Sequence, residues 1–274
     1  MLFWDNTLLK YLELANEDVR VVQFVSERIL PKVARLRGSI NWLEVGPGPG
    51  TKTAALFETL AALLESRLEL TKLLEPCPTW ITYLRNFQTL LFADSQKRKV
   101  VLENTSFEEY ETELGLEGET EGSNFITFFH VLYEHKIIES TAKYLQRKAA
   151  SHSPLIACIV IESTDSDFYR LRRELQALGF EVPVAAAELI PDWFSKLGIP
   201  VTINSINDQY CRIIPGCSYR DWLLDFLLGC ERRVISELSA TARKEADHLL
   251  ANFIKQRSNK FLYVPDLAIT AVFG

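Results

Sequence analysis

The sequence predicts an α/β fold: a seven-stranded, mostly parallel sheet with helices on both faces and a helical cap. Three observations support this prediction. From residue 40 onward, apolar runs of strand length alternate with helical runs, which is typical of a buried parallel sheet. A glycine-rich loop joins the first apolar run to a helix. The first 38 residues and a long segment near the C-terminus are helical and lie outside this alternation.

The individual elements follow from the periodicity of the apolar residues. Residues 1–38 are predicted to be helical, with a break at Asn16 and a kink or an end at Pro31. Strands are predicted at residues 40–45, 68–74, 99–102, 125–132, 155–161, 201–206 and 267–273. Helices are predicted at residues 53–64, 80–92, 140–150, 168–178 and within 219–256. Residues 115–123 are expected to form an acidic surface loop.

A chain of 274 residues suits one large domain. We expect a ligand-binding core of residues 39–207 plus the last strand, 267–273. Residues 1–38 and the helices inserted at 208–262 would form the cap. Periodicity alone allows these helices either to select a substrate or only to cover the sheet.

Composition excludes several classes of protein. A chain that is 47% hydrophobic and 24% charged is not disordered, and no apolar run reaches the roughly 20 residues of a membrane span. The net charge of −6 argues against a nucleic-acid partner. With five cysteines, no CxxC pair and no signal-peptide pattern, we expect reduced thiols and a cytoplasmic protein. The four histidines lack metal-site spacing, so no metal is expected.

The segment INWLEVGPGPGTKTAAL, residues 40–56, is the most informative one. Its three loop glycines let the backbone turn sharply and a ligand approach, and the following helix N-terminus supplies oriented N–H groups. A dinucleotide fingerprint needs glycine where Thr51 stands, which disfavours an NAD-dependent enzyme. Glu44, ahead of the loop, would repel a pyrophosphate but suits a cationic ligand such as S-adenosyl-L-methionine.

Two further positions follow predicted strands. Glu75 and Pro76 end the second strand, and a carboxylate there accepts hydrogen bonds from ribose hydroxyls in nucleotide-binding α/β folds. The alternative for Glu75 is a solvated side chain. His130, in FITFFHVLYEH, falls near the end of the fourth strand, where an imidazole can accept a proton or position a ligand.

These motifs, in this order and spacing, resemble class I S-adenosylmethionine-dependent methyltransferases, and among them the histamine N-methyltransferase branch. The resemblance extends over nearly the whole chain, through YLELANEDVRVVQFV, LEVGPGPG, LEP, TSFEEY, FFHVLYEHK, DWLLDFL and the final strand. It implies a Rossmann-like fold, a substrate cap, S-adenosyl-L-methionine as cofactor and a small-molecule acceptor, preferably an amine or imidazole nitrogen.

The motifs and the resemblance together assign site residues. The expected cofactor contacts are Glu44, Gly46, Gly48, Gly50, Glu75, Pro76, Thr105, Ser106, Phe129 and His130. The branch's substrate-binding glutamate falls on Glu17, which with His130 forms the expected catalytic pair. The further expected acceptor contacts are Tyr133, Phe168, Trp222 and Asp266.

The chain departs from the branch at three places, and two other functions stay open. An asparagine of the branch is replaced around Pro265-Asp266, a cofactor-contacting glutamine by Trp80, and a pocket aromatic by Arg172. The diverged cap allows an O- or C-methyltransferase of a secondary metabolite. A catalytically silent binding module is the other alternative, although the intact glycine loop and Glu75 argue against it. A monomer is slightly favoured, with the oligomeric state open.

Overall fold

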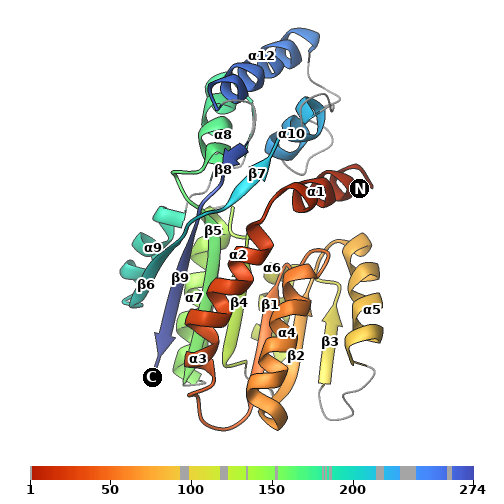
Figure 1. The fold of residues 1–274 in the computed structure, drawn as a ribbon. Coiled ribbons are helices and arrows are strands. Elements are labelled where there is room, and N and C mark those ends of the chain that lie inside the picture. The colour runs from red at the N-terminus through yellow and green to blue at the C-terminus, as the bar shows by residue number, and fades with distance from the viewer. Residues whose placement is uncertain are drawn as a thin grey trace.

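The computed structural model describes residues 2–92, 99–117, 123–133, 135–151, 154–180, 182, 184, 187–213, 219–228, 239–257 and 261–274. A seven-stranded sheet has the order β3-β2-β1-β4-β5-β9-β6 (Figure 1). Its strands are β1 (Ile40–Val45), β2 (Leu68–Leu74), β3 (Lys99–Glu103), β4 (Phe125–Phe129), β5 (Leu155–Glu162), β6 (Val201–Ile206) and β9 (Asp266–Phe273). In this sheet β9 is antiparallel to β5 and β6, and the other pairs are parallel, which confirms the predicted fold class.

Helices cover both faces of the sheet because successive residues of a strand point to opposite sides. Trp42 and Phe125 bury on the face covered by α2 and α4. Leu43 and Ile126 bury on the other face, in the core that includes residues of α6, α7 and α9. The helices of the sheet domain are α2 (Glu17–Phe24), α4 (Thr51–Leu64), α5 (Pro78–Phe92), α6 (Phe107–Glu117), α7 (His135–Ser151) and α9 (Ile190–Lys196), with short 3₁₀ turns η2 (Glu65–Arg67) and η3 (Ala187–Leu189).

The N-terminal segment is helical as predicted, in several pieces. After α1 (Leu2–Leu14) and α2 come a π-helical turn, η1 (Val25–Ile29), and α3 (Leu30–Val33). Pro31 lies in the first turn of α3, where a missing N–H removes no intrahelical hydrogen bond. The chain therefore continues in a helical path past the proline.

A second group of elements lies beyond the carboxyl ends of the parallel strands (Figure 1). It consists of α8 (Asp167–Ala177), α10 (Tyr219–Leu228), α12 (Ala240–Gln256) and the two-stranded sheet of β7 (Tyr210–Arg212) and β8 (Phe261–Tyr263). Tyr11, Phe168, Leu223 and Leu250 belong to one hydrophobic cluster that joins α1, α8, α10 and α12. The helix α8, within the predicted core range, thus packs with the cap.

Several boundaries differ from the prediction. Strand β4 ends at Phe129 instead of residue 132, because His130 has a φ of 57°, which an extended strand does not allow. Residues 115–117 of the predicted surface loop belong to α6, and residues 118–122 lie outside the described residues. Residues 229–238 of the predicted 219–256 helical stretch also lie outside them. Among the helices that are described, none is both long and apolar enough to cross a bilayer.

Candidate functional site

The glycine loop turns back over the ends of β1 and β2. Gly46, Gly48 and Gly50 all have positive φ, between 59° and 84°, a backbone conformation that residues other than glycine rarely adopt. A Cβ on Gly46 would lie 2.3 Å from Cγ1 of Val131, so the two segments approach too closely for any other residue. A Cβ on Gly48 would meet no heavy atom within 4 Å. The loop backbone at Gly48 therefore borders open space.

Glu75 is bound to this loop. The Gly48 N–H donates to Oε2 of Glu75 and the Cys77 N–H donates to Oε1, each at 2.9 Å. The end of β3 contacts the same turn, since the Asn104 side-chain amide donates to the Glu75 carbonyl at 2.9 Å. Glu75 is 4% exposed, which excludes the alternative of a solvated side chain. Its buried carboxylate holds the glycine loop and the turn after β2 together.

A cavity of about 450 Å³ opens beside the glycine loop, at the carboxyl ends of the strands. This is the usual ligand position in open α/β sheets, and the volume is typical of small-molecule sites. Of the residues assigned from the sequence, those that line it are Glu17, Gly46, Gly48, Glu75, Pro76, Ser106, Phe129, His130 and Tyr133. Phe168 and Asp266 line a small adjoining recess together with Glu17 and His130. The structure thus brings most of the assigned positions into one place.

Four assigned residues lie outside this cavity and its recess. Gly50 is the N-cap of α4, and Thr105 turns its hydroxyl toward Glu109, at 3.2 Å. Trp222 packs, partly buried, against the hydrophobic cluster of the cap. Glu44 lies two residues after Trp42 in β1 and thus faces the same side, toward α4, and is 1% exposed. Among the described residues, none hydrogen bonds to its Oε2.

Burial raises the pKa of Glu44 to about 7. A carboxyl whose pKa is higher in the folded than in the unfolded chain favours folding while it is protonated, and this advantage is lost as the pH rises from about 4.5 toward 7. We expect Glu44→Gln to remove this pH-dependent loss of stability. The unfolding free energy of the variant minus that of the wild type should increase by roughly 3 kcal/mol between pH 4.5 and pH 8, measured by urea unfolding at both pH values.

The control is Glu58→Gln, which removes the same formal charge from an exposed position of α4. This variant should not reproduce the increase. An unchanged difference between Glu44→Gln and the wild type across the pH range would show that the buried carboxyl is not the titrating group.

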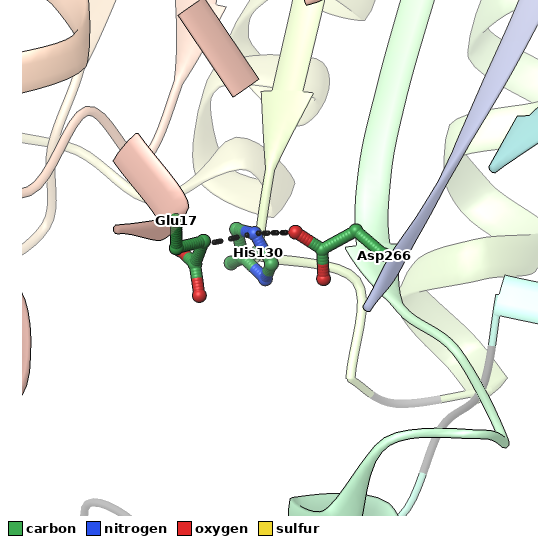
Figure 2. Close-up of side chains that lie close together, drawn as sticks. All are labelled: Glu17, His130 and Asp266. Carbon is green, nitrogen blue, oxygen red and sulfur yellow. Dashed lines mark ion pairs between the residues drawn. The ribbon is translucent and has the colours of Figure 1, made fainter. Parts of the chain in front are cut away.

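Three polar side chains from distant parts of the chain meet (Figure 2), and all three line the small recess that adjoins the cavity. Glu17 begins α2, His130 follows β4, and Asp266 begins β9. Nε2 of His130 lies 3.2 Å from Oε1 of Glu17 and 3.2 Å from Oδ2 of Asp266. Glu17 and Asp266 are 7% and 2% exposed, so two carboxylates are buried against one imidazole. We call Glu17, His130 and Asp266 the triad.

The triad is electrostatically coupled. Burial lowers the pKa of His130, but the negative charges of Asp266 and Glu17 outweigh it and raise this pKa to about 9. Burial raises the pKa of Glu17, an effect that the His130 charge opposes. In the protein alone, the imidazolium therefore balances part of the buried negative charge.

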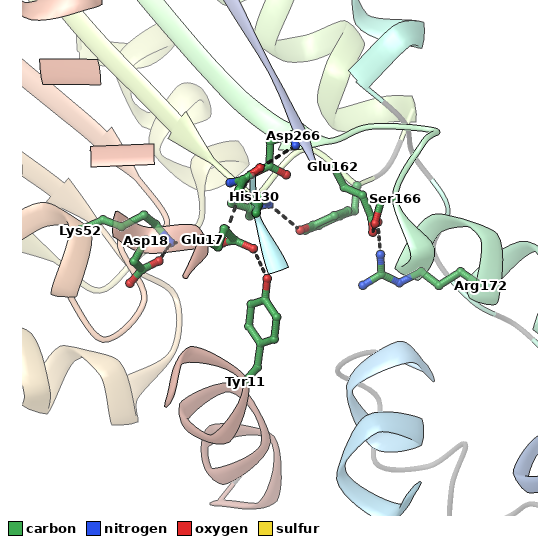
Figure 3. Close-up of polar contacts among 11 residues, drawn as sticks. Tyr11, Glu17, Asp18, Lys52, His130, Glu162, Ser166, Arg172 and Asp266 are labelled. Carbon is green, nitrogen blue, oxygen red and sulfur yellow. Dashed lines mark hydrogen bonds and ion pairs between the residues drawn. The ribbon is translucent and has the colours of Figure 1, made fainter. Parts of the chain in front are cut away.

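Each member of the triad is also fixed by a neighbour (Figure 3). The hydroxyl of Tyr11 donates to Oε2 of Glu17, and Nε2 of Gln209 donates to Oδ2 of Asp266 at 2.8 Å. The Tyr133 hydroxyl lies 3.3 Å from Nδ1 of His130. The triad side chains are thus held in place before any ligand binds.

Charged pairs flank the triad on both sides (Figure 3). Lys52 of α4 binds Asp18 at 2.7 Å and lies 3.8 Å from Oε1 of Glu17. Arg172 of α8 binds Glu162, whose other oxygen accepts from Ser166 at 2.6 Å. Arg172 and Trp80, two of the three departures noted in the sequence, both line the cavity.

Sequence reasoning missed Tyr11, Lys52, Glu162 and Gln209 as site residues. Lys52 is the second residue after the glycine loop, and Glu162 ends β5, so both occupy positions at which a ligand site is expected in this fold. These two could have been found from the predicted elements. Tyr11 and Gln209 lie in α1 and between β6 and β7, and no local pattern marks them.

Comparisons with solved structures identify the fold. A cyclopropane-fatty-acyl-phospholipid synthase-like protein from Lactobacillus casei is 13% identical, covers 93% of this chain and 92% of its own, and has a TM-score of 0.58. A candidate sarcosine dimethylglycine methyltransferase from Galdieria sulphuraria is 12% identical, with 93% and 86% covered and a TM-score of 0.51. Mycolic acid cyclopropane synthase CmaA1, solved with SAH and CTAB, is 12% identical, with 90% and 83% covered and a TM-score of 0.50.

The chain therefore has the Rossmann-like fold of class I methyltransferases. Its sequence matches no family model and no curated protein. At 12–13% identity the structural likenesses establish the fold, and they do not distinguish the histamine N-methyltransferase branch from others.

Proposed function

We propose that this protein is an S-adenosyl-L-methionine-dependent methyltransferase that acts on a small molecule, preferably at an amine or imidazole nitrogen. The observation that carries the proposal is the single cavity that connects the glycine loop and Glu75 to Glu17 and His130. One end has the backbone and carboxylate groups for a nucleoside, and the other end has polar groups buried among aromatic side chains. A cofactor and an acceptor can thus face each other in one cavity.

The loop end fits the cofactor. Open space at Gly48 allows a ligand to approach the backbone, and Glu75 supplies carboxylate oxygens for ribose hydroxyls. Pro76, Ser106 and Phe129 line the same cavity. When bound there, S-adenosyl-L-methionine supplies an electrophilic methyl group on its sulfonium.

The end with Glu17 and His130 would align the acceptor. Methyl transfer is an in-line displacement, so the protein must point a lone pair at the methyl carbon and exclude water. Glu17 can accept a hydrogen bond from an acceptor N–H and thereby orient the lone pair. Tyr11, Phe226 and Tyr133 form apolar walls beside it. The resemblance to the histamine N-methyltransferase branch supports nitrogen as the accepting atom, while Arg172 and Trp80 point to an acceptor other than histamine.

We expect Glu17→Gln to raise the KM for the acceptor roughly tenfold, because a charge-assisted hydrogen bond is replaced by a neutral one. Affinity for S-adenosylhomocysteine should stay within about twofold of the wild type, since this variant leaves Glu75 and the loop backbone unchanged. The measurement is transfer of labelled methyl to a panel of amines, imidazoles, phenols and small peptides, followed by kinetics on the best acceptor. Unchanged acceptor kinetics in this variant would remove Glu17 from the acceptor site.

Glu13→Gln is the matched control, because Glu13 is exposed and pairs with Lys10 on the surface of α1. It should leave both the acceptor KM and the cofactor affinity unchanged. Activity on phenols alone would replace nitrogen with oxygen as the accepting atom.

A further inference from the structure

We propose that the triad of Glu17, His130 and Asp266 binds a divalent transition-metal ion, of the Zn²⁺ or Mn²⁺ class, in the small recess that adjoins the cavity. One imidazole nitrogen and two carboxylate oxygens form a donor set that such ions accept. The donor atoms of the three residues lie within 4.8 Å of one another. This proposal does not rest on methyl transfer, because metal binding is measurable without cofactor or acceptor.

The spacing of the donor atoms fits a shared cation. At metal–ligand distances of about 2.0–2.2 Å, neighbouring ligand atoms stand roughly 2.8–3.1 Å apart in octahedral and roughly 3.3–3.6 Å apart in tetrahedral geometry. Nε2 of His130 lies 3.2 Å from an oxygen of each carboxylate. Nε2 itself is buried, and no hydrogen bond of acceptable geometry reaches it from the described part of the chain. The nitrogen therefore lies close to both carboxylates without a well-aligned hydrogen bond to either.

The groups around the triad are those that hold metal ligands in place. Metal-binding histidines and carboxylates usually have their other polar atoms or faces fixed by hydrogen bonds. Here Tyr11 holds the second oxygen of Glu17, and Tyr133 lies 3.3 Å from Nδ1 of His130. Gln209 donates to Oδ2 of Asp266, the oxygen proposed as a ligand, and thereby fixes its position. His130 itself sits at a φ of 57°, an uncommon conformation for a residue with a side chain.

The local charge also favours a dication. Within the described part of the chain, the network around the triad contains the buried carboxylates of Glu17, Glu162 and Asp266 and the partly buried one of Asp18. Its two permanent cations are Lys52 and Arg172. With a neutral His130 as ligand, two negative charges remain to be balanced. A divalent ion would balance both, and its remaining coordination positions would face the cavity, which both Glu17 and His130 line.

The spacing of residues in the sequence did not predict these three ligands, because they are far apart along the chain. Metal motifs read from sequence rely on ligands a few residues apart, whereas these come from α2, the end of β4 and the start of β9. Only the folded sheet brings them together. An acceptor bound beside Glu17 would then meet the metal as well.

The test is calorimetric titration of the chelator-treated full chain with ZnCl₂, MnCl₂ and MgCl₂. We expect one equivalent of Zn²⁺ or Mn²⁺ to bind to the wild type and to raise its melting temperature. His130→Ala and Asp266→Asn should each weaken this binding at least roughly 100-fold. The control His248→Ala removes an exposed histidine of α12 and should leave binding intact.

Circular dichroism establishes whether each variant is folded. If one of them is not, the isosteric Glu17→Gln takes its place, and we expect it to weaken metal binding to the same extent. No binding of either transition metal, binding of Mg²⁺ alone, or binding unaffected by the triad variants would overturn the proposal and leave the triad as an ion pair. Titration of the same samples with S-adenosylhomocysteine reports separately on the proposed methyltransferase function.

Discussion

Replacement of Glu75 by alanine should lower the affinity for S-adenosylhomocysteine at least roughly 100-fold. Two losses combine in this variant. The ribose hydroxyls lose their carboxylate acceptor, and the N–H groups of Gly48 and Cys77 lose the two oxygens that now hold the loop. Hydrogen bonds to charged groups are worth about 1.5–3 kcal/mol each, so two of them account for a change of this size. Isothermal titration calorimetry measures it.

Glu103→Gln is the matched control for this variant. Glu103 ends β3 as Glu75 follows β2, but it pairs with Lys72 at 3.2 Å and does not line the cavity. Its replacement should leave the affinity unchanged. Glu75→Gln, which keeps one acceptor oxygen, should fall between alanine and the wild type. Wild-type affinity in Glu75→Ala would mean that the ligand binds elsewhere.

Replacement of Gly46 by alanine should destabilise the protein by roughly 2–5 kcal/mol. The positive φ of 66° imposes backbone strain, and the added Cβ would lie 2.3 Å from Cγ1 of Val131. For a chain of this size, the melting temperature should fall by about 10 °C. Differential scanning calorimetry gives the shift, and cofactor binding should weaken in parallel because the loop must move away from Val131.

Two other variants separate the strain from the clash. Gly38 and Gly179 also have positive φ, 78° and 90°, but a Cβ at either would meet no atom within 4 Å. Gly38→Ala and Gly179→Ala should therefore cost only about 1–2 kcal/mol. Adding Val131→Ala to Gly46→Ala should recover part of the loss. If Gly46→Ala is no worse than Gly38→Ala, close packing of the loop against Val131 is not required.

Much of the sheet was predictable from sequence because buried parallel strands are apolar runs that end at glycine, proline or charged residues. The bounds of β1 and β2 agree with the prediction for this reason, and those of the antiparallel edge strand β6 agree as well. The end of β4 does not, since Val131 and Leu132 continue the apolar run after the chain has turned at His130. A positive φ at a histidine leaves no trace in hydrophobic periodicity.

The candidate site likewise contains residues that the sequence predicts and residues that it does not. The glycine loop and Glu75 were recognisable because they follow two successive predicted strands, which place them side by side. Glu44 was assigned to the ligand, yet in the structure it faces α4 beneath the loop, since residues alternate between the faces of a strand. The partners of the triad, Tyr11 and Gln209, come from segments whose positions depend on the packing of the cap.

The most direct test of the central claim is a calorimetric titration of the purified chain with S-adenosylhomocysteine, with NADH titrated in parallel. We expect one equivalent of S-adenosylhomocysteine to bind in the micromolar range or tighter, no binding of NADH, and loss of the signal in Glu75→Ala. Absence of S-adenosylhomocysteine binding to the folded wild-type chain would contradict the assignment of this protein as a methyltransferase.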